Sequence, residues 1–375
     1  MKIRDFELER WQSKWEHNVN YNMSESGVHP LTFEELSDED DIKKILRTKL
    51  GYIQTDGTPE LKEEIIKFYP EIHKNNILVT TGSIEANFLL IWHLVEKGDE
   101  AVFMLPNFMQ IFGLMEGFGA NVKTFYLKEN LEWNPDINDL KKTITKNTKI
   151  IAITNPNNPT GSQLNEDARS AILDLAKWAN AWLISDEVYQ GAELNGTLTP
   201  SFYGTYEKTI VVSGLSKSYG LPGLRVGWIA GPENLIQNLW SYKDYTSIVI
   251  SALSDRLARI ALQTQVRKKI YERTRGIIKR NFSILDSWMK KFKSLFECIP
   301  PKAGAICFPG YNLDINSSDL AHKIRKDKSV LIQPGDQLGV DHHIRFGLGQ
   351  QEDEFKKALK LVGESFEEYI ELSKL

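Results

Sequence analysis

The chain has 375 residues, 41% of them hydrophobic and 26% charged, which is typical of a soluble globular protein and not of a disordered or fibrous one. The formal net charge is −4 and basic residues are dispersed, which argues against nucleic acid as a partner. The first residues lack the apolar segment of a signal peptide, and no run is long enough to span a bilayer, so we expect a cytoplasmic protein without a membrane partner.

Short apolar runs rich in β-branched residues alternate with helical patterns over about residues 46–245. The strand-like runs cover residues 77–79, 101–105, 122–126, 149–154, 181–185, 209–213 and 226–230. Helical spacing of apolar residues occurs between them, at residues 84–95, 166–178 and 234–242. This alternation predicts crossover connections, and therefore an α/β fold with a mostly parallel sheet of seven strands.

The pattern changes after the last of these strands. Residues 251–291 carry a long amphipathic period, which predicts a helix or a pair of helices that connects two domains. Strand-like runs follow at residues 303–308, 329–332 and 343–346, with helical runs at 320–325 and 353–369. These runs predict a smaller α+β domain. Cys298 and Cys307 lie in this part of the chain; two cysteines are too few for a disulfide framework, and we expect both to be buried structural thiols.

The chain is therefore expected to have three parts. Residues 33–36 and 40–46 form short helical pieces that precede the sheet region. We predict an N-terminal segment (1–45) that packs with the small domain, a large cofactor-binding domain (46–285) and a small C-terminal domain (286–375).

Polar motifs directly follow three of the strand-like runs. The run that ends at residue 154 is followed by Asn155-Pro156-Asn157-Asn158-Pro159-Thr160-Gly161, the run that ends at 185 by Asp186, and the run that ends at 213 by Ser216-Lys217. Ligands bind beyond the carboxyl ends of the strands in open α/β sheets, so these residues are candidates for a functional site. Each motif alone also fits an ordinary turn, but turns explain the shared order of all of them poorly.

Lys217 is followed eight residues later by Arg225, in the segment Gly223-Leu224-Arg225-Val226-Gly227-Trp228. Upstream lie Thr81-Gly82-Ser83 and Pro106-Asn107-Phe108, each just after a strand-like run. A lysine beside an arginine suggests an amine that forms a Schiff base next to a phosphate anchor. Together the motifs indicate a pyridoxal phosphate site.

These motifs resemble those of the class I/II aminotransferases, which are fold type I enzymes dependent on pyridoxal 5'-phosphate, and the resemblance runs from about Gly27 to Arg345. It implies that Lys217 forms the aldimine with the cofactor and moves the proton at the substrate's Cα. A buried amine near cationic groups has a lowered pKa, which we expect for Lys217. The resemblance further implies that Asp186 pairs with the pyridine nitrogen, and that Tyr189 and Asn158 bond the phenolic oxygen of the ring.

The phosphate group is expected at the start of the helix that follows residue 81. The resemblance implies that Gly82, Ser83 and the backbone amide of Ile84 bind it there, where free amides and the helix dipole favour an anion. Ser216 and Arg225 would complete the site, since the guanidinium is a planar, permanently charged donor. Many family members carry a serine or threonine three residues before the lysine, but this chain has Gly214 there, and whether Ser213 replaces the missing hydroxyl stays open.

Four further positions take their predicted roles from the resemblance. Phe108 would stack on the face of the pyridine ring, although core packing is the alternative for a single phenylalanine. Arg345 would grip the α-carboxylate of the substrate in a bidentate pair, with Gly27 facing it and Asn158 nearby. Tyr52 would reach the phosphate of the neighbouring subunit, which implies a homodimer. We find no second arginine for a side-chain carboxylate, so the sequence does not support a dicarboxylate substrate.

The function predicted first is transfer of an amino group from an α-amino acid to a 2-oxo acid. Two alternatives share the fold and the cofactor: β-elimination lyases that cleave carbon–sulfur bonds, and amino-acid cyclases. Residues 6–11 and 24–28, the latter reading Ser24-Glu25-Ser26-Gly27-Val28, resemble capreomycidine-synthase-like members. Substrate orientation separates these outcomes, and the sequence does not fix it.

Other classes of protein fit the sequence less well. A ligand sensor of the same fold would carry an N-terminal DNA-binding domain, and too few residues precede the first sheet motif to hold one. A nicotinamide dehydrogenase would need a glycine-rich turn after its first strand, and the glycines from Gly220 to Gly227 have the wrong spacing for it. His342 and His343 lack partners at a zinc-type spacing, so we expect no metal.

Overall fold

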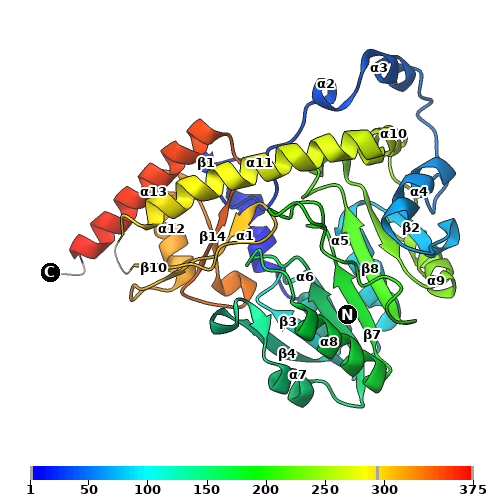
Figure 1. The fold of residues 1–375 in the computed structure, drawn as a ribbon, viewed down its shortest axis with the longest axis horizontal. Coiled ribbons are helices and arrows are strands. Elements are labelled where there is room, and N and C mark those ends of the chain that lie inside the picture. The colour runs from blue at the N-terminus through cyan, green and yellow to red at the C-terminus, as the bar shows by residue number, and fades with distance from the viewer. Residues whose placement is uncertain (1–2, 293–294, 373–375) are drawn as a thin grey trace.

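The computed structural model of the protein describes residues 3–292 and 295–372. A long helix, α11 (Thr264–Met289), runs from a body built around a large sheet to a second, smaller body (Figure 1). α10 (Ala252–Leu262) precedes it, so the predicted amphipathic stretch is a pair of helices. None of the described helices combines the length and the apolar character needed to cross a membrane.

The large sheet has eight strands within the described residues, in the order β2-β9-β8-β7-β6-β3-β4-β5. They are β2 (Ile77–Thr80), β3 (Glu100–Leu105), β4 (Asn121–Lys128), β5 (Asn134–Pro135), β6 (Thr148–Thr154), β7 (Trp182–Asp186), β8 (Thr209–Gly214) and β9 (Gly227–Ala230). The five strands from β8 to β4 are parallel to one another, whereas β9 is antiparallel to both of its neighbours. The predicted α/β fold with its mostly parallel sheet is confirmed; β5, a polar two-residue strand without a strand-like pattern, adds an eighth.

Both faces of this sheet are covered, which is why its strands are continuous apolar runs. Along β6, Ile150 and Ala152 pack toward α5 and α6, and Ile151 and Ile153 pack toward α8 on the opposite face. Around the sheet lie α4 (Pro59–Ile65), α5 (Gly82–Leu94), α6 (Gln110–Phe118), α7 (Ile137–Thr143), α8 (Glu166–Ala179) and α9 (Glu233–Lys243). The side-chain alternation of period two thus fixes which residues of a strand face each of the two helix layers.

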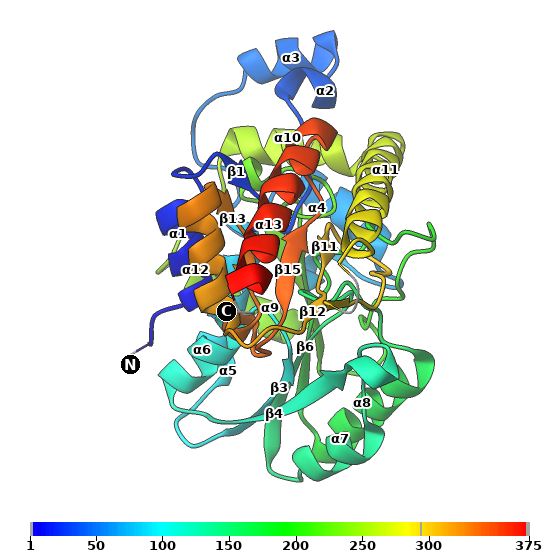
Figure 2. The ribbon, with the colours of Figure 1, turned by 90° about the vertical axis from the view of Figure 1, so that its left-hand side faces the viewer.

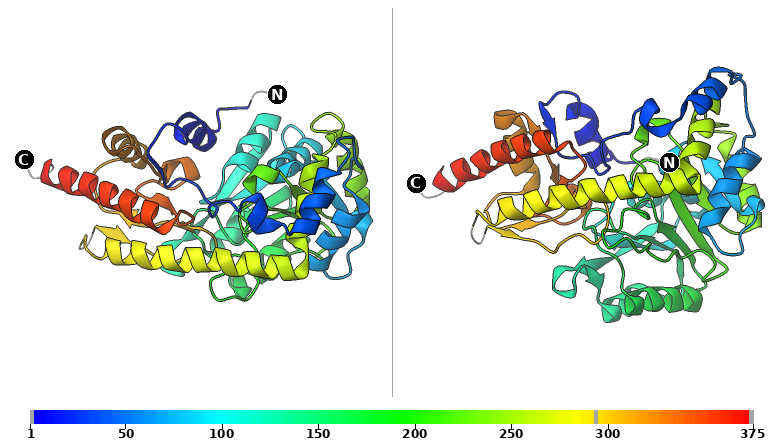
Figure 3. Two further views of the ribbon diagram at one scale, coloured as in Figure 1. Left: turned by 90° about the horizontal axis from the view of Figure 1, so that it is seen from above. Right: turned by 45° about the horizontal axis from the view of Figure 1, so that its top comes forward.

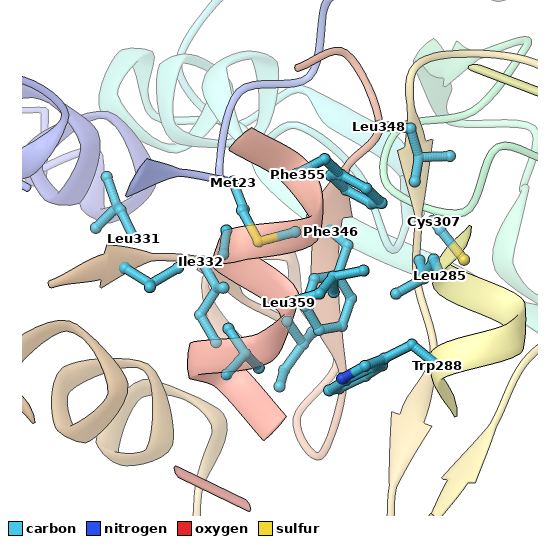
Figure 4. Packing of buried hydrophobic residues seen from close by; sticks show 14 of the residues in the cluster. Met23, Leu285, Trp288, Cys307, Leu331, Ile332, Phe346, Leu348, Phe355 and Leu359 are labelled. Carbon is cyan, nitrogen blue, oxygen red and sulfur yellow. The ribbon is translucent and has the colours of Figure 1, made fainter. Parts of the chain in front are cut away.

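The smaller body contains two helices, α12 (Ser317–Lys328) and α13 (Glu352–Leu372), and short strands. The strands are β10 (Phe296–Glu297), β11 (Ile306–Cys307), β12 (Gly310–Tyr311), β13 (Val330–Leu331), β14 (Gln333–Pro334) and β15 (Ile344–Gly347). α13 lies alongside α11 (Figure 3). Trp288 of α11, Phe346 of β15 and Leu359 of α13 belong to one apolar cluster with Cys307 (Figure 4).

The two cysteines are only partly as predicted. Cys307 is buried in β11, but Cys298 is only half-buried, and their Sγ atoms lie 3.4 Å apart. Cys298 follows the exposed edge strand β10, where one side of the chain faces solvent, so the prediction that both thiols are buried is wrong for Cys298.

The N-terminal segment divides between the two bodies. α1 (Glu7–Trp15) lies beside α12, with the rings of Trp11 and His322 4.5 Å apart, and β1 (Tyr21–Asn22) pairs with β13 (Figure 2). Leu36, at the end of α2 (Phe33–Leu36), packs instead in the cluster beside α4 and α10. The exact domain boundaries stay a prediction.

α3 (Glu39–Leu46) has no buried residue and projects from the body above α10 (Figures 1 and 2). Five short 3₁₀ turns complete the described elements: η1 (Ile66–Phe68), η2 (Lys74–Asn76), η3 (Glu129–Leu131), η4 (Pro222–Leu224) and η5 (Asp336–Leu338). In η5, the carbonyl oxygen of Leu338 accepts a hydrogen bond from the N–H of Asn107, just beyond the carboxyl end of β3.

Candidate active site

A cavity of about 410 Å³ opens at the carboxyl ends of β6, β7 and β8. Most of the predicted site residues line it, namely Ser83, Ile84, Phe108, Asn158, Asp186, Tyr189, Ser216, Lys217, Arg225 and Arg345. The strands, the start of α5 and β15 therefore bring together side chains that are up to about 260 residues apart in the chain. α1 closes the cavity on another side and contributes Leu8, Glu9 and Gln12.

Lys217, just after β8, forms an ion pair with Glu25, with 3.0 Å between Lys217 Nζ and Glu25 Oε1. The lysine holds the pKa of the Glu25 carboxyl down to about 2. Burial lowers the pKa of Lys217, but the negative charge of Glu25, its hydrogen bond and the electrostatic interaction with the nearby Tyr189 raise it further than burial lowers it, and the net result is above the ordinary value. The prediction of a lowered pKa for Lys217 is therefore wrong in this structure, because the sequence did not reveal Glu25 as its neighbour.

Asp186 is the last residue of β7, and its carboxyl group is buried. The N–H of Val188 donates to Asp186 Oδ1 at 3.1 Å. Burial raises the pKa of Asp186 to about 6, against the opposing hydrogen bonds and the more distant charge of Lys217. A buried carboxyl group that lines a cavity and has no cation at ion-pair distance in the described chain fits a protonated ring nitrogen as its missing partner.

Arg345, on β15, is fully buried at the wall of the cavity. Its Nη1 donates to Asn158 Oδ1 at 2.9 Å, and its Nη2 donates to the carbonyl oxygen of Ser24 at 2.6 Å. The Nε atom is buried and has no hydrogen-bond partner among the described residues. A guanidinium held in place by neutral acceptors keeps its full charge for an anionic ligand.

Tyr189 follows Asp186 by three residues and lies against the same cavity, almost completely buried. Burial raises the pKa of its hydroxyl, although the charges of Lys217 and Arg345 act in the opposite direction. The phenol is thus neutral and can donate a hydrogen bond to an oxygen in the cavity.

The predicted phosphate site is built at the start of α5. Gly82 is the first residue of this 13-residue helix and has a φ of +77°, and a Cβ at this position would collide with the Arg225 guanidinium. Arg225 Nη1 donates to Ser216 Oγ at 3.3 Å and to the carbonyl oxygen of Pro222 at 3.0 Å. A helix N-terminus with an arginine directly against it fits the phosphate group of the cofactor.

Gly214 has a structural reason to be glycine. A Cβ there would lie 2.9 Å from the carbonyl oxygen of Val226 and 3.2 Å from the Cα of Gly227, on the antiparallel neighbour β9. Ser213 is not among the residues that line the cavity, so the cavity wall gives no support to a replacement of the missing hydroxyl by Ser213.

Of the remaining predicted residues, one lines the cavity, one packs behind it and one lies outside it. Phe108 lines the cavity and its ring packs edge-on against Phe6, with 4.9 Å between ring centroids. Gly27 does not line the cavity directly; a Cβ on it would be 3.3 Å from the carbonyl oxygen of Ser216 and 3.7 Å from Lys217 Cδ, so its backbone packs against the lysine. Tyr52 is 86% exposed and is not part of the cavity wall within one chain.

Several cavity residues were missed from the sequence. They are Phe6, Leu8, Glu9, Gln12, Glu16, Glu25, Ser26, Gln110, Thr154, Val188 and Pro222. Most come from the N-terminal segment, whose place over the sheet depends on its packing with the smaller body. The spacing of Glu9, Gln12 and Glu16 on one face of a helix was the available signal.

Comparison with known proteins identifies the family. The profile described as aminotransferase class I and II matches residues 14–362. This chain belongs to that family. Among solved structures, a PLP-dependent aminotransferase from Streptococcus suis 89-1591 superposes with a TM-score of 0.91 at 31% identity, covering 98% of this chain and 99% of that chain.

Two curated class I and II aminotransferase relatives differ in their activities. Capreomycidine synthase of Streptomyces vinaceus is 27% identical over 366 residues, which are 95% of this chain and 92% of that protein. A probable aspartate aminotransferase of Methanocaldococcus jannaschii is 29% identical over 332 residues, 85% of this chain and 86% of that protein. The predicted resemblance to the class I/II aminotransferases, and to capreomycidine-synthase-like members, is confirmed. The cofactor of this class I and II aminotransferase is pyridoxal phosphate, and its reaction class is transamination.

Proposed function

We propose that the protein transfers the amino group of an α-amino acid to a 2-oxo acid at the cavity lined by Lys217, Asp186 and Arg345. The observation that supports this most strongly is the convergence of one amine, one buried carboxyl group and one buried guanidinium in a single cavity of about 410 Å³. These groups match the three needs of the reaction: a base at Cα, a partner for the ring nitrogen, and an anchor for the α-carboxylate.

Pyridoxal phosphate, when bound, supplies the electron sink for the pair of electrons that remains when Cα loses its proton. Arg225, Ser216 and the amides at Gly82 and Ser83 would hold its phosphate, and Asp186 would keep its ring nitrogen protonated. Tyr189 and Asn158 would bond its phenolic oxygen, and Phe108 would cover one face of its ring. Burial raises the pKa of Asp186 to about 6, and a cationic partner would favour its ionised form.

The protein's own groups position the substrate. Arg345 orients the α-carboxylate, because its guanidinium is already fixed by Asn158 and by the carbonyl oxygen of Ser24. Lys217 Nζ then takes the proton from Cα as a general base, which requires that the amine first give up the proton it shares with Glu25.

We further propose that two copies of the chain form the active unit, with Tyr52 reaching the site of the partner subunit. Large apolar side chains are exposed in the segment that contains it: Leu46 is 81% exposed, Leu50 82% and Tyr52 86%. α3, which ends at Leu46, projects from the body without a buried residue (Figure 1). An exposed apolar arm of this kind is typical of a surface that another subunit covers. The cytoplasmic location stays a prediction.

The test of the function is the absorbance spectrum of the purified protein, loaded with pyridoxal phosphate, over about 300–550 nm. Adding single amino acids should convert the cofactor to its amine form and release the matching 2-oxo acid. The Lys217→Ala variant should lose both the visible band and this conversion, because no other amine lines the cavity within the described residues. Release of ammonia and an oxo acid with the visible band retained would assign a lyase instead, and a cyclised product would assign a cyclase. Full conversion by Lys217→Ala would contradict the proposal.

A further inference from the structure

The cavity has an acidic side that the proposed reaction does not use. Glu9 and Gln12 lie on α1 and Glu16 caps its C-terminus with a helical backbone; three and four residues apart, they share one face of the helix, and all three line the cavity. Leu8, on the same helix, is buried in the apolar cluster between the large sheet and α8, and this contact fixes α1 against the large sheet. The polar face of α1 is therefore held over the cavity rather than free in solvent.

Each cation of the cavity already has an anion assigned to it. Lys217 is paired with Glu25 at 3.0 Å, Arg225 lies against the phosphate site at Gly82, and Arg345 faces the position of the substrate's α-carboxylate. Asp186 in turn would receive the protonated ring nitrogen. Glu9 and Glu16 are the carboxylates that remain on the cavity wall, and the described residues of the wall offer no further cation to pair with them.

Glu9 has no ion pair with any described residue, and Glu16 has one contact, 3.5 Å from Oε1 to Nε2 of the exposed His17. Burial raises the pKa of Glu9, while the charges of Lys217 and Arg345 act in the opposite direction and Glu25 and Glu16 add to the increase. A carboxylate in this position gains most from a new cation, because burial and two like charges both disfavour its ionised form.

An independent feature shows that the same cavity is built for a charged ligand. Arg345 is 1% exposed, lines the cavity, and keeps its buried Nε atom without a hydrogen-bond partner among the described residues. A ligand that satisfies both sides of the cavity carries an anion toward Arg345 and a cation toward α1. An α-amino acid provides the anion with its carboxylate, so the cation must come from its side chain.

On the basis of the proposed function, we propose that the amino donor is an α-amino acid whose side chain ends in a cation, an amine or a guanidinium, and that Glu9 and Glu16 bind this group. A dicarboxylic amino acid would bring a second carboxylate against these two residues. Like charges at a desolvated contact strongly disfavour a wrong partner. The acidic face of α1 thus selects the donor at the side chain, while Arg345 selects it at the α-carboxylate.

The test compares pairs of donors that differ only in the terminal amino group of the side chain. Lysine is matched with norleucine and ornithine with norvaline, with arginine and aspartate as further donors, and the rate of conversion of the cofactor-loaded protein to the amine form is measured for each. We expect the cationic donor of each pair to have a higher kcat/KM, on the order of tenfold or more. Equal or better reaction of norleucine, norvaline or aspartate would overturn this inference and leave transamination intact. A protein that converts no amino acid at all would instead overturn the proposed function.

Variants of α1 separate recognition from a structural effect. In Glu9→Gln and Glu16→Gln the kcat/KM for lysine should fall toward that for norleucine, so that the ratio of the two values drops toward one. Glu7→Gln is the matched control, because Glu7 is exposed on the same helix and does not line this cavity. A parallel loss for both donors would mean that the glutamates only support the fold, and it would contradict their proposed contact with the side chain.

Discussion

The ion pair between Glu25 and Lys217 sets the charge of the amine that must react. Its removal in Glu25→Gln leaves burial, the largest single influence, which lowers the pKa of Lys217; of the remaining neighbours, Tyr189 acts against burial and Arg345 acts with it. Below the pKa, each unit by which it falls gives about tenfold more neutral amine at a given pH. We therefore expect the cofactor-free variant to bind added pyridoxal phosphate faster than the wild type near neutral pH, by about tenfold or more, measured as the appearance of the visible band.

The pH dependence of the rate of pyridoxal phosphate binding provides the control for the role of Glu25. In the wild type the rate should keep rising with pH to well above neutrality, since the folded protein holds the proton on Lys217; in Glu25→Gln the rise should occur at lower pH. Identical pH profiles in the two proteins would show that Glu25 does not control the amine. Glu7→Gln, on the exposed side of α1, should behave like the wild type.

At the scale of elements, three glycines bring β8, β9 and α5 unusually close. Gly214 and Gly227 are opposite each other in the antiparallel pair, and a Cβ on Gly227 would lie 2.6 Å from the backbone of Gly82 and Ser83. This approach places the loop of Lys217 and the helix N-terminus at the phosphate site next to each other. Gly214 and Gly227 are therefore required by the close packing of backbone, and Gly82 is required in addition by its positive φ.

Gly214→Ala is expected to force β8 and β9 apart, because its Cβ would lie 2.9 Å from the carbonyl oxygen of Val226. The variant should lose about 1–3 kcal/mol of stability and bind pyridoxal phosphate more weakly, measured as the thermal unfolding midpoint and the cofactor dissociation constant. Gly231→Ala is the matched change just after β9, where the nearest atoms would be 3.8 Å from the new Cβ, and it should be close to neutral. Equal effects of both substitutions would refute the packing argument.

Elements and residues differ in how far the sequence predicts them. Buried strands followed by polar residues were predictable, since the continuous apolar runs needed for a sheet covered on both faces end just before Asn158, Asp186 and Lys217. The neighbours of these residues were not predictable, because Glu9 and Glu25 reach the cavity only through tertiary packing of the N-terminal segment. For the same reason the predicted direction of the pKa shift of Lys217 was wrong. The need for a cation beside Asp186, by contrast, follows from the burial of its carboxyl group alone.

For the whole molecule, the proposed dimer would make each active site a product of two chains. A site would take Lys217 from one subunit and Tyr52 from the other, and the exposed segment around Tyr52 and Leu50 would be covered. Sedimentation should then give a mass of about twice the 42.9 kDa of the chain. Tyr52→Ala should lower cofactor affinity although this side chain lies outside the cavity wall of its own chain, whereas Tyr126→Ala, at a half-exposed tyrosine of β4, should not.

Mixing two inactive variants tests this arrangement directly. In a mixed dimer of Lys217→Ala and Tyr52→Ala chains, one site carries both substitutions and the other carries neither, because its lysine and its tyrosine come from different subunits. After unfolding and refolding an equal mixture, half of the dimers should be mixed, so about a quarter of all sites should be of wild-type composition and activity should recover to about that level. Each variant refolded alone should stay defective. A mixture no more active than the average of its two components would show that Tyr52 does not serve the partner's site, and the monomer would then have to bind the cofactor phosphate with Arg225, Ser216 and the start of α5 alone.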